Sequence, residues 1–529
     1  MLCKCEYYLL LLHRSCATGF SCCWRLRIIS TMNLLRLIPP PIRNPYLKWA
    51  FFFCWSFFVL LWLSPDSYLA HLCAWREDSA WFFTAGKAWM EGMTPYVDFA
   101  DSKGPLLWLI YGIGYLISPT SYIGVFWMSV LAYTFTFAFL WRTARLFVGQ
   151  RTALLVLALM PLLLFFRNYH NEIRAEDFCM TFICIGLYST CRVVKDADTH
   201  SIVRRYAFVL GMAMACVLLI KWNVFFMMGG MALVVVVVSF QHKSFDGLLF
   251  GLAGIAIVVL PFIVYFLYKG CLGAFIHEYF VTTFLITGNG MNDGKWRTLA
   301  YNFPTDRYFL YGAIELMVVF VGIILFCRRF HVSYWLVLAF VPVAWFLVFQ
   351  PTWYYYFITM MPFFLFLLLF VADCCSFVIV RAPLMVIEFV ALVIYCCTIC
   401  YNATSQKFIF SPAPEQAEWD AIQSVLTKKQ KPRILCVFSD LGQGILSRAL
   451  PACKYWALQN GSGDDIKAER QQAIRERKAD FVLVNNKNPE RLEPYIFTIL
   501  QQSGYHQCVV QVVENGKTVM KALPVYAKE

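Results

Sequence analysis

The sequence predicts a polytopic α-helical membrane protein with about eleven spans, one interfacial helix and a small α/β domain at its C-terminus. Two observations lead to this prediction. Of the 529 residues, 60% are hydrophobic and only 15% are charged, whereas about a quarter of the residues of a soluble globular protein are charged. Apolar stretches of roughly 17 to 25 residues also recur along the chain, which is the length of a helix that crosses a hydrocarbon core about 30 Å thick.

The net charge of +13 does not indicate a nucleic-acid-binding protein, because the basic residues lie in short clusters between the apolar stretches. Such clusters orient membrane spans. Most of the 21 cysteines lie inside apolar stretches or within the first 23 residues, so they do not define a disulfide framework. Cys436, Cys453 and Cys508 fall in the C-terminal domain, where one disulfide could form.

Residues 1–47 are predicted to be a cytoplasmic N-terminal segment. The apolar run near Met1 is shorter and richer in cysteine than a secretory signal peptide. Met32 is a second candidate start, in which case residues 1–31 are not part of the native protein. Several basic residues precede the first span at residues 48–63, and this favours the cytoplasmic side for the N-terminus.

The apolar stretch 104–118, GPLLWLIYGIGYLIS, decides the topology. It has about 15 residues, fewer than a span needs, so we expect an interfacial helix that does not cross the membrane. The basic sequence WRTARLFVGQR that ends the next span then lies in the cytoplasm, whereas a crossing helix would place it outside. The further spans are predicted at residues 122–140, 152–166, 178–193, 206–220, 224–240, 248–268, 309–326, 334–349, 353–370 and 384–401. An odd number of spans leaves the N-terminus inside and the C-terminus outside.

Residues 48–402 are therefore the predicted transmembrane region, and residues 403–529 the predicted extracytoplasmic α/β domain. In the latter, PRILCVFSD and ADFVLVN are typical of short buried strands, and a stretch rich in Arg, Glu and Gln between them is typical of a helix. The segments CVVQVV and KTVMKAL flank ENG, which predicts a β-hairpin.

Two outer loops carry acidic and basic residues at the membrane edge, where ionisable groups are costly and often functional. The candidate site residues are Glu77, Asp78, Asp101 and Lys103 in the first loop, and Arg174, Glu176 and Asp177 in the second. The predicted orientation places both loops in the same compartment. The outer loop GNGMNDGKWR adds Asp293, Lys295 and Arg297 as further possible contacts.

A carboxylate that accepts a proton beside a cation that neutralises a phosphate suits group transfer from a lipid-phosphate donor. Structural explanations also exist for these residues. Asp78 can cap the helix that follows it, Lys103 can anchor at lipid headgroups, and Glu176 and Asp177 can cap the next span. The sequence TWYYYF could form a ligand cradle or belong to the aromatic belt of the membrane interface.

Motifs for other chemistry are absent from the sequence. It contains no Walker loop, HExxH or GxSxG motif, and His170, His277 and His506 do not have the spacing of metal ligands. These absences argue against the commonest ATPases, zinc proteases and serine hydrolases. The sequence predicts no cofactor and leaves a divalent metal open.

The acidic pair beyond the first span, followed by the pattern xxGxxPYxDxxDxKGPL, resembles the membrane glycosyltransferases of the C superfamily. It is similar to the lipid A aminoarabinose transferase and the protein O-mannosyltransferases, and most of all to members from Bacteroides-type bacteria. The resemblance implies that Asp78, with Glu77 as its rival, is an essential carboxylate, and that Lys103 contacts the lipid phosphate. Relatives often have Asp-Glu in place of Glu-Asp and proline in place of Gly104, so the choice between the two acids stays open.

We therefore expect an inverting glycosyltransferase that moves a sugar from a polyprenyl phosphate to a lipid, glycan or protein acceptor. It would act on the outer face of a bacterial inner membrane. Asp78, or its rival Glu77, would activate the acceptor hydroxyl. Lys103 and Arg174 would stabilise the leaving phosphate, and Asp101, Glu176 and Asp177 would bind substrate. The alternatives are a lipid-linked glycan flippase or transporter and a polysaccharide polymerase or ligase. Transporters often carry charged residues within spans and two related halves, whereas here the acids lie in outer loops and no repeat is visible.

Overall fold

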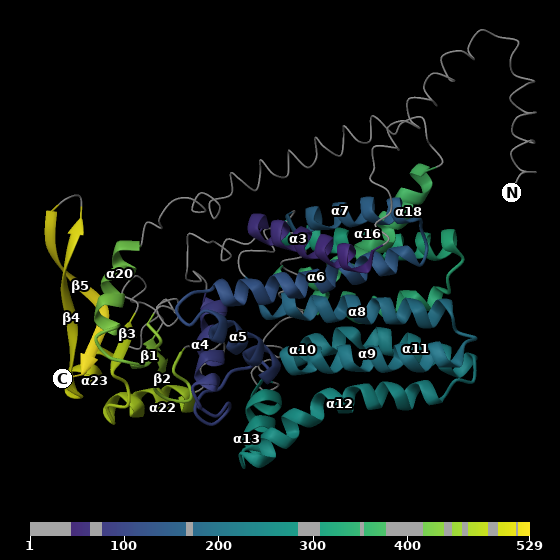
Figure 1. Ribbon diagram of the computed structural model, residues 1–529. Coiled ribbons are helices and arrows are strands. Elements are labelled where there is room, and N and C mark those ends of the chain that lie inside the picture. Colours follow the sequence, from purple (N-terminus) through teal and green to yellow (C-terminus); the bar gives the residue numbers. More distant parts are fainter. Residues whose placement is uncertain are drawn as a thin grey trace, which may run out of the picture.

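The computed structural model describes a bundle of helices with a small sheet-containing part at one end (Figure 1). The described residues are 44–63, 77–165, 173–283, 307–349, 354–376, 416–437, 447–457, 464–484, 496–514 and 517–528. The predicted span at residues 384–401, Met32 and the loop with Asp293, Lys295 and Arg297 lie outside them.

The predicted spans between residues 48 and 370 coincide with helices, which extend a few residues further at some ends. The helices are α3 Pro45–Leu63, α6 Ile123–Arg145, α7 Gln150–Phe165, α8 Ala175–Lys195, α9 His200–Ile220, α10 Trp222–Phe225, η2 Phe226–Met228, α11 Gly229–Gln241, α12 Asp246–Tyr268, α16 Arg307–Phe330, η4 Tyr334–Ala339, α17 Val341–Phe349, η5 Tyr354–Met360 and α18 Met361–Ser376. Within the described part of the chain, six helical segments are long and apolar enough to cross a membrane.

Helix α12 lies at the outside of the bundle, with most of its apolar residues partly or fully exposed. Only 11% of its most apolar stretch is buried, and exposed leucines such as Leu252 and Leu260 lie along it. The helix packs against α9 at small residues: a Cβ on Gly254 would lie 2.1 Å from the backbone oxygen of Phe208. Close backbone approach on one side and exposed apolar side chains on the other are typical of a helix between protein and lipid.

Helices α3 and α6 run antiparallel, which fixes where the chain between them begins and ends. Lys48 near the start of α3 lies 5.4 Å from the ring centre of Trp141 near the end of α6. Phe57 near the end of α3 lies 5.8 Å from Phe126 near the start of α6. The segment between the two helices therefore starts and finishes at the same end of the bundle, as expected if the interfacial stretch does not cross.

That segment contains two shorter helices, α4 Glu77–Met90 and α5 Pro105–Ile117. With 13 residues, α5 is about 20 Å long, less than the thickness of a hydrocarbon core. It is nevertheless well packed, because α5 contacts α4 and α6 and buries Leu107, Trp108 and Tyr111.

The C-terminal residues form a five-stranded mixed sheet in the order β2-β1-β3-β5-β4. Strand β1 pairs in parallel with β2 and β3, and β5 pairs antiparallel with β3 and β4. The elements are α20 Gln416–Leu426, β1 Arg433–Val437, β2 Leu450–Pro451, α22 Asp464–Arg475, β3 Phe481–Val484, α23 Ile496–Gln502, β4 Tyr505–Glu514 and β5 Lys517–Lys528. The two predicted strands and the hairpin are confirmed, whereas Cys436, Cys453 and Cys508 are all free thiols, so the considered disulfide is not present.

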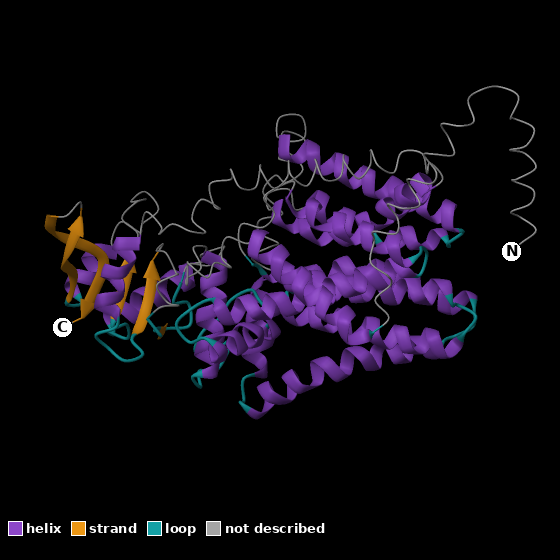
Figure 2. Ribbon diagram, turned by 45° about the horizontal axis from the view of Figure 1, so that its top comes forward, coloured by secondary structure: helices purple, strands orange, loops and turns teal. Residues whose placement is uncertain are grey.

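The sheet lies at the same end of the bundle as α4 and α5, as both views show (Figure 1, Figure 2). Strand β2 contacts α4 directly. The described parts of the two predicted outer loops, residues 77–118 and 173–177, therefore lie at the end of the bundle where the C-terminal sheet lies.

Candidate functional site

Residues 94–104, here called the lysine loop, form a tightly closed turn before α5. Tyr96 has a positive φ of 66°, a left-handed conformation that is uncommon for a residue with a side chain. Its N–H donates to the backbone oxygen of Phe99 at 2.7 Å, and its hydroxyl donates to the backbone oxygen of Lys103 at 3.0 Å. The buried Tyr96 ring also packs 4.7 Å from Trp108 of α5. These contacts hold the end of the loop, which carries Lys103, at the start of α5.

The ammonium group of Lys103 has partners from its own loop and from α4. Its Nζ lies 3.6 Å from Oδ2 of Asp101 and donates to Oγ of Ser102 at 3.1 Å. It also lies 5.5 Å from the ring centre of Phe82. Asp101 and Lys103 are thus brought together as a pair, with the carboxylate orienting the ammonium group.

Gly104 joins the lysine loop to the end of α9. Its N–H donates to the backbone oxygen of Ile220 at 2.9 Å, and a Cβ at this position would lie 2.0 Å from the backbone oxygen of Leu219. Only glycine permits this approach. The contact places Lys103 next to the end of α9, which is followed directly by Lys221.

The predicted site residue Glu176 pairs with Lys221, which the sequence analysis did not identify. Lys221 Nζ donates to Oε1 of Glu176, and both side chains are buried. The ammonium group also lies 4.3 Å from the ring centre of Tyr356, whose hydroxyl accepts a hydrogen bond from Asn223 at 2.9 Å. The only sequence signal for Lys221 was a lone lysine between two long apolar stretches. A buried ion pair of this kind needs compensation in its surroundings, and the Tyr356 ring adds a cation–π contact.

Asp177 has a structural role. Its Oδ2 accepts from the backbone N–H of Arg174 at 2.9 Å, at the N-terminus of its own helix α8. Its Oδ1 accepts from the hydroxyl of Tyr133 at 2.6 Å. Because both oxygens are engaged inside the protein, the geometry favours the capping explanation over direct substrate binding.

Asp78 lies at the start of α4, close to the residues that precede α8. Its Oδ2 lies 4.0 Å from Nε of Arg174. The neighbouring Ser79 hydroxyl donates to the backbone oxygen of Ile173 at 2.8 Å and thereby ties the two segments together. Of Glu77 the structure describes only its position as the first residue of α4.

The predicted carboxylates differ in how far their side chains are exposed to solvent. The Asp78 side chain is 42% exposed, compared with 9% for Asp101, 2% for Glu176 and 3% for Asp177. Among these four, Asp78 is therefore the carboxylate that a substrate outside the protein can reach.

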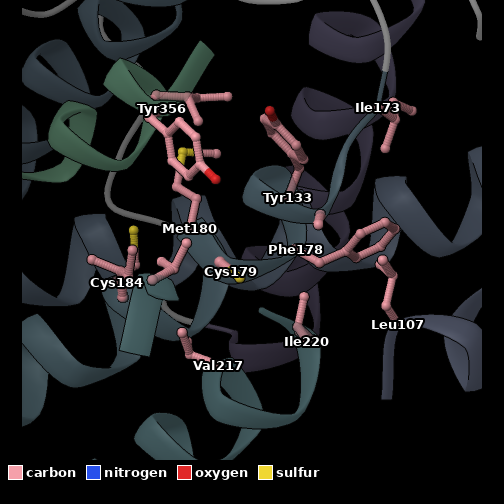
Figure 3. Packing of buried hydrophobic residues seen from close by; sticks show 14 of the residues in the cluster. Leu107, Tyr133, Ile173, Phe178, Cys179, Met180, Cys184, Val217, Ile220 and Tyr356 are labelled. Carbon is pink, nitrogen blue, oxygen red and sulfur yellow. The ribbon is translucent and has the colours of Figure 1, made fainter. Parts of the chain in front are cut away.

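The site rests on a packed hydrophobic cluster to which α5, α8 and α9 all contribute. Figure 3 shows Phe178 of α8 pointing toward Leu107 of α5, with Ile220 of α9 below them. The hydroxyl of Tyr111 on α5 donates to the backbone oxygen of Ile173 at 3.0 Å. The elements that carry Lys103, Lys221 and Glu176 therefore share one core.

Helix α4 also contains a buried basic group. Lys87 has no exposed surface, and burial lowers its pKa from 10.5 to about 7. Glu91 raises this pKa and Arg448 lowers it, both to a smaller extent. As for metals, no group of three or more His, Cys, Asp or Glu side chains in the described ranges is arranged to hold an ion.

About a third of the chain matches a known protein family. Residues 102–268, which are 167 of the 529 residues, match the model of the family described as dolichyl-phosphate-mannose-protein mannosyltransferase. The matched region includes Lys103, Arg174, Glu176 and Lys221. A comparison with curated proteins finds no match.

The fold is similar to that of ArnT from Cupriavidus metallidurans. The apo structure of ArnT has a TM-score of 0.53 and 13% identity, over 92% of this chain and 98% of ArnT. The structure of ArnT bound to undecaprenyl phosphate has a TM-score of 0.52 and 13% identity, over 90% of this chain and 98% of ArnT. At this identity the likeness is one of fold, and it extends over almost the whole of both chains.

Proposed function

We propose that this chain, a multi-pass membrane protein with the fold of the C-superfamily membrane glycosyltransferases, transfers a sugar from a polyprenyl phosphate to an acceptor. The observation that carries this proposal is an accessible carboxylate beside a partly buried arginine, with two further cations at the same end of the bundle. Asp78 is reachable and adjoins Arg174, while Lys103 and Lys221 flank the contact between the lysine loop and α9. The family match over residues 102–268 and the fold shared with ArnT bound to undecaprenyl phosphate support a lipid-phosphate donor.

The proposed reaction is a single displacement with inversion at the sugar. The acceptor hydroxyl oxygen attacks the anomeric carbon, the bond from that carbon to the phosphate oxygen breaks, and the electron pair leaves with the polyprenyl phosphate. Asp78 accepts the proton of the acceptor, and Arg174 orients the Asp78 carboxylate. Lys103, oriented by Asp101, stabilises the negative charge that develops on the leaving phosphate. Glu176 pairs with Lys221, which follows α9 directly after the contact between α9 and Gly104.

The proposed location is the outer face of a bacterial inner membrane. Basic residues lie in the last turns of α6 and α8, among them Arg145 and Lys195, and Lys195 donates to the backbone oxygen of Leu146. These turns are at the opposite end of the bundle from the C-terminal sheet (Figure 1). Because basic loops favour the cytoplasm, this arrangement supports placing the C-terminal sheet outside. With this orientation we propose about eleven spans, with residues 48–402 as the transferase region and residues 403–529 outside.

A test in cells compares the mass spectra of glycolipids and glycans with and without the protein. We expect one defined sugar to be lost, restored by the wild-type chain and not by Asp78→Asn, because transfer should fall at least about 100-fold without the general base. Glu77→Gln is the matched control, and we expect it to restore the sugar.

Wild-type restoration by Asp78→Asn would rule out Asp78 as the base, and loss in Glu77→Gln alone would move that role to Glu77. Unchanged glycans with altered sidedness of a lipid-linked glycan would favour a flippase. A change in glycan chain length in place of one lost sugar would indicate a polymerase or ligase.

A further inference from the structure

We propose that residues 452–457, here called the docking segment, position the lysine loop for sugar transfer and so make the C-terminal domain a working part of the site. The inference rests on the proposed function. Three independent sets of contacts carry it, from the backbone, from an ion pair and from a series of packed aromatic rings.

The backbone of the docking segment bridges the sheet and the lysine loop. On one side, the N–H of Ala452 donates to the backbone oxygen of Ile434 at 3.0 Å, and the N–H of Cys436 donates to that of Trp456 at 2.7 Å. On the other side, the N–H of Ala100 donates to the backbone oxygen of Lys454 at 3.0 Å. Ala100 immediately precedes Asp101. Strand β1 therefore holds the docking segment, and the docking segment holds the end of the lysine loop that carries Asp101 and Lys103.

Two side chains of the docking segment bind one buried carboxylate. Lys454 Nζ lies 2.5 Å from Oε1 of Glu278, and the Tyr455 hydroxyl donates to Oε2 at 3.0 Å. Glu278 is 6% exposed and lies in η3 His277–Thr282, a π-helical turn of the kind that often marks functional sites.

The residue after Glu278 leads back to the lysine loop. The hydroxyl of Tyr279 donates to the backbone oxygen of Leu218 at 2.5 Å and would lie 2.8 Å from a Cβ on Gly104. Its ring is 6.3 Å from that of Tyr96. The contacts of Lys454 and Tyr455 with Glu278 therefore fix the position of Tyr279, against which the lysine loop packs.

A series of aromatic rings makes the third connection. Trp456 stacks on Trp81 of α4 at 5.8 Å, Trp81 packs 6.2 Å from Trp108, and Trp108 packs 4.7 Å from Tyr96. Trp456 has no exposed surface. Since Trp81 lies three residues after Asp78, the same rings link the docking segment to both ends of the first outer loop.

The test compares two lysines of the C-terminal domain that each pair with an acidic residue of the bundle. Lys454→Met removes the contact to Glu278. Lys431→Met is the matched control, because Lys431 pairs with Glu91, the residue that follows α4, outside the lysine loop. Both variants are studied as the full chain in lipid nanodiscs.

In Lys454→Met we expect amide hydrogen exchange at Ala100 and its neighbours to rise about fivefold or more, since the loop opens more often. We expect kcat for transfer to fall about tenfold with the donor KM within about twofold, because the phosphate-binding cations remain but are misplaced in the transition state. The melting temperature and the yield of folded chain should match those of the control, which a merely structural role would not predict.

Unchanged exchange and unchanged kcat in Lys454→Met would overturn the inference. An equal loss in Lys431→Met would also overturn it, because general attachment of the domain would then explain the effect. If the wild-type chain transferred no sugar, the proposed function would fail, and the exchange measurement would still show whether the docking segment holds the loop.

Discussion

Gly104 is the residue at which the lysine loop and α9 meet. In Gly104→Ala, the added Cβ would lie 2.0 Å from the backbone oxygen of Leu219, so the loop must move away from α9. Because Lys103 is the proposed ligand of the phosphate, its displacement with the loop is expected to lower kcat/KM about 10- to 100-fold. Overpacking should also lower stability by about 1–3 kcal/mol. Transfer kinetics and thermal unfolding of the purified chain measure the two effects.

Gly273→Ala is the matched control for this prediction. It makes the same change in the short helix α13 Leu272–Ile276, where an added Cβ meets no atom within 4 Å. We expect wild-type kinetics for this variant. Wild-type kinetics for Gly104→Ala as well would show that the position of Lys103 does not depend on its contact with α9.

At single residues, the sequence identified candidate side chains but did not identify all the residues that they contact. The residue types around the lysine loop identified Asp101 and Lys103, and these do form a pair. Lys221 and Glu278 could not be found in this way, because each was singled out only by its ion pair with a distant residue. Lys221 pairs with Glu176, 45 positions away in the chain, and Glu278 pairs with Lys454, 176 positions away. Spacing along a sequence reports neighbours on one helix or strand, whereas these pairs arise from packing between elements.

At the scale of elements, helix α4 is expected to make stability depend on pH. The pKa of Lys87 is lowered from 10.5 to about 7 by burial. Between these values the unfolded chain binds one proton more than the folded chain, so stability rises with pH, by up to about 1.4 kcal/mol per pH unit. Below pH 7 both states are protonated and this dependence ends. Lys87→Met should remove the slope, as measured by melting temperatures between pH 6 and 9.5.

Lys428→Met serves as the control, since Lys428 is exposed after helix α20 and should leave the slope unchanged. An unaltered slope in Lys87→Met would mean that Lys87 stays protonated in the folded protein across this range. The charged form would then have a partner strong enough to offset its burial.

The helices themselves were predicted well because their signal is local. A long apolar stretch must cross lipid as a helix, since no water is present to satisfy its backbone groups. The length of the stretch at residues 104–118 and the basic residues that end the next span predicted an interfacial helix. Helices α3 and α6 run antiparallel, as that prediction requires. The extensive burial of α5 against α4 and α6 was not predictable, because apolar composition alone does not distinguish a lipid partner from a protein partner.

At the scale of the whole molecule, the orientation predicts which ends of the helices a membrane-impermeant thiol reagent can reach. Thr199 precedes α9 at the basic end of the bundle, and Gln430 lies between α20 and β1 at the opposite end; both are exposed. In intact cells stripped of their outer membrane, Gln430→Cys should be labelled and Thr199→Cys should be labelled only after lysis. The wild-type chain gives the background from its native cysteines.

The reverse labelling pattern would leave the helices as described but place Asp78 and Lys103 in the cytoplasm. The proposed reaction on the outer face would then be wrong. Labelling of both positions in intact cells would mean that the two ends of the bundle do not lie in separate compartments.

The contact between Ala100 and Lys454 has a consequence for how the protein is made. The ribosome adds Lys454 about 350 residues after Lys103. At typical rates of synthesis this is a delay of roughly 20 to 70 seconds. During that time the early helices can already be inserted in the membrane, but the lysine loop has no docking segment to hold it. We therefore expect a nascent chain to stay inactive on the translocon until its last hundred residues have emerged and folded.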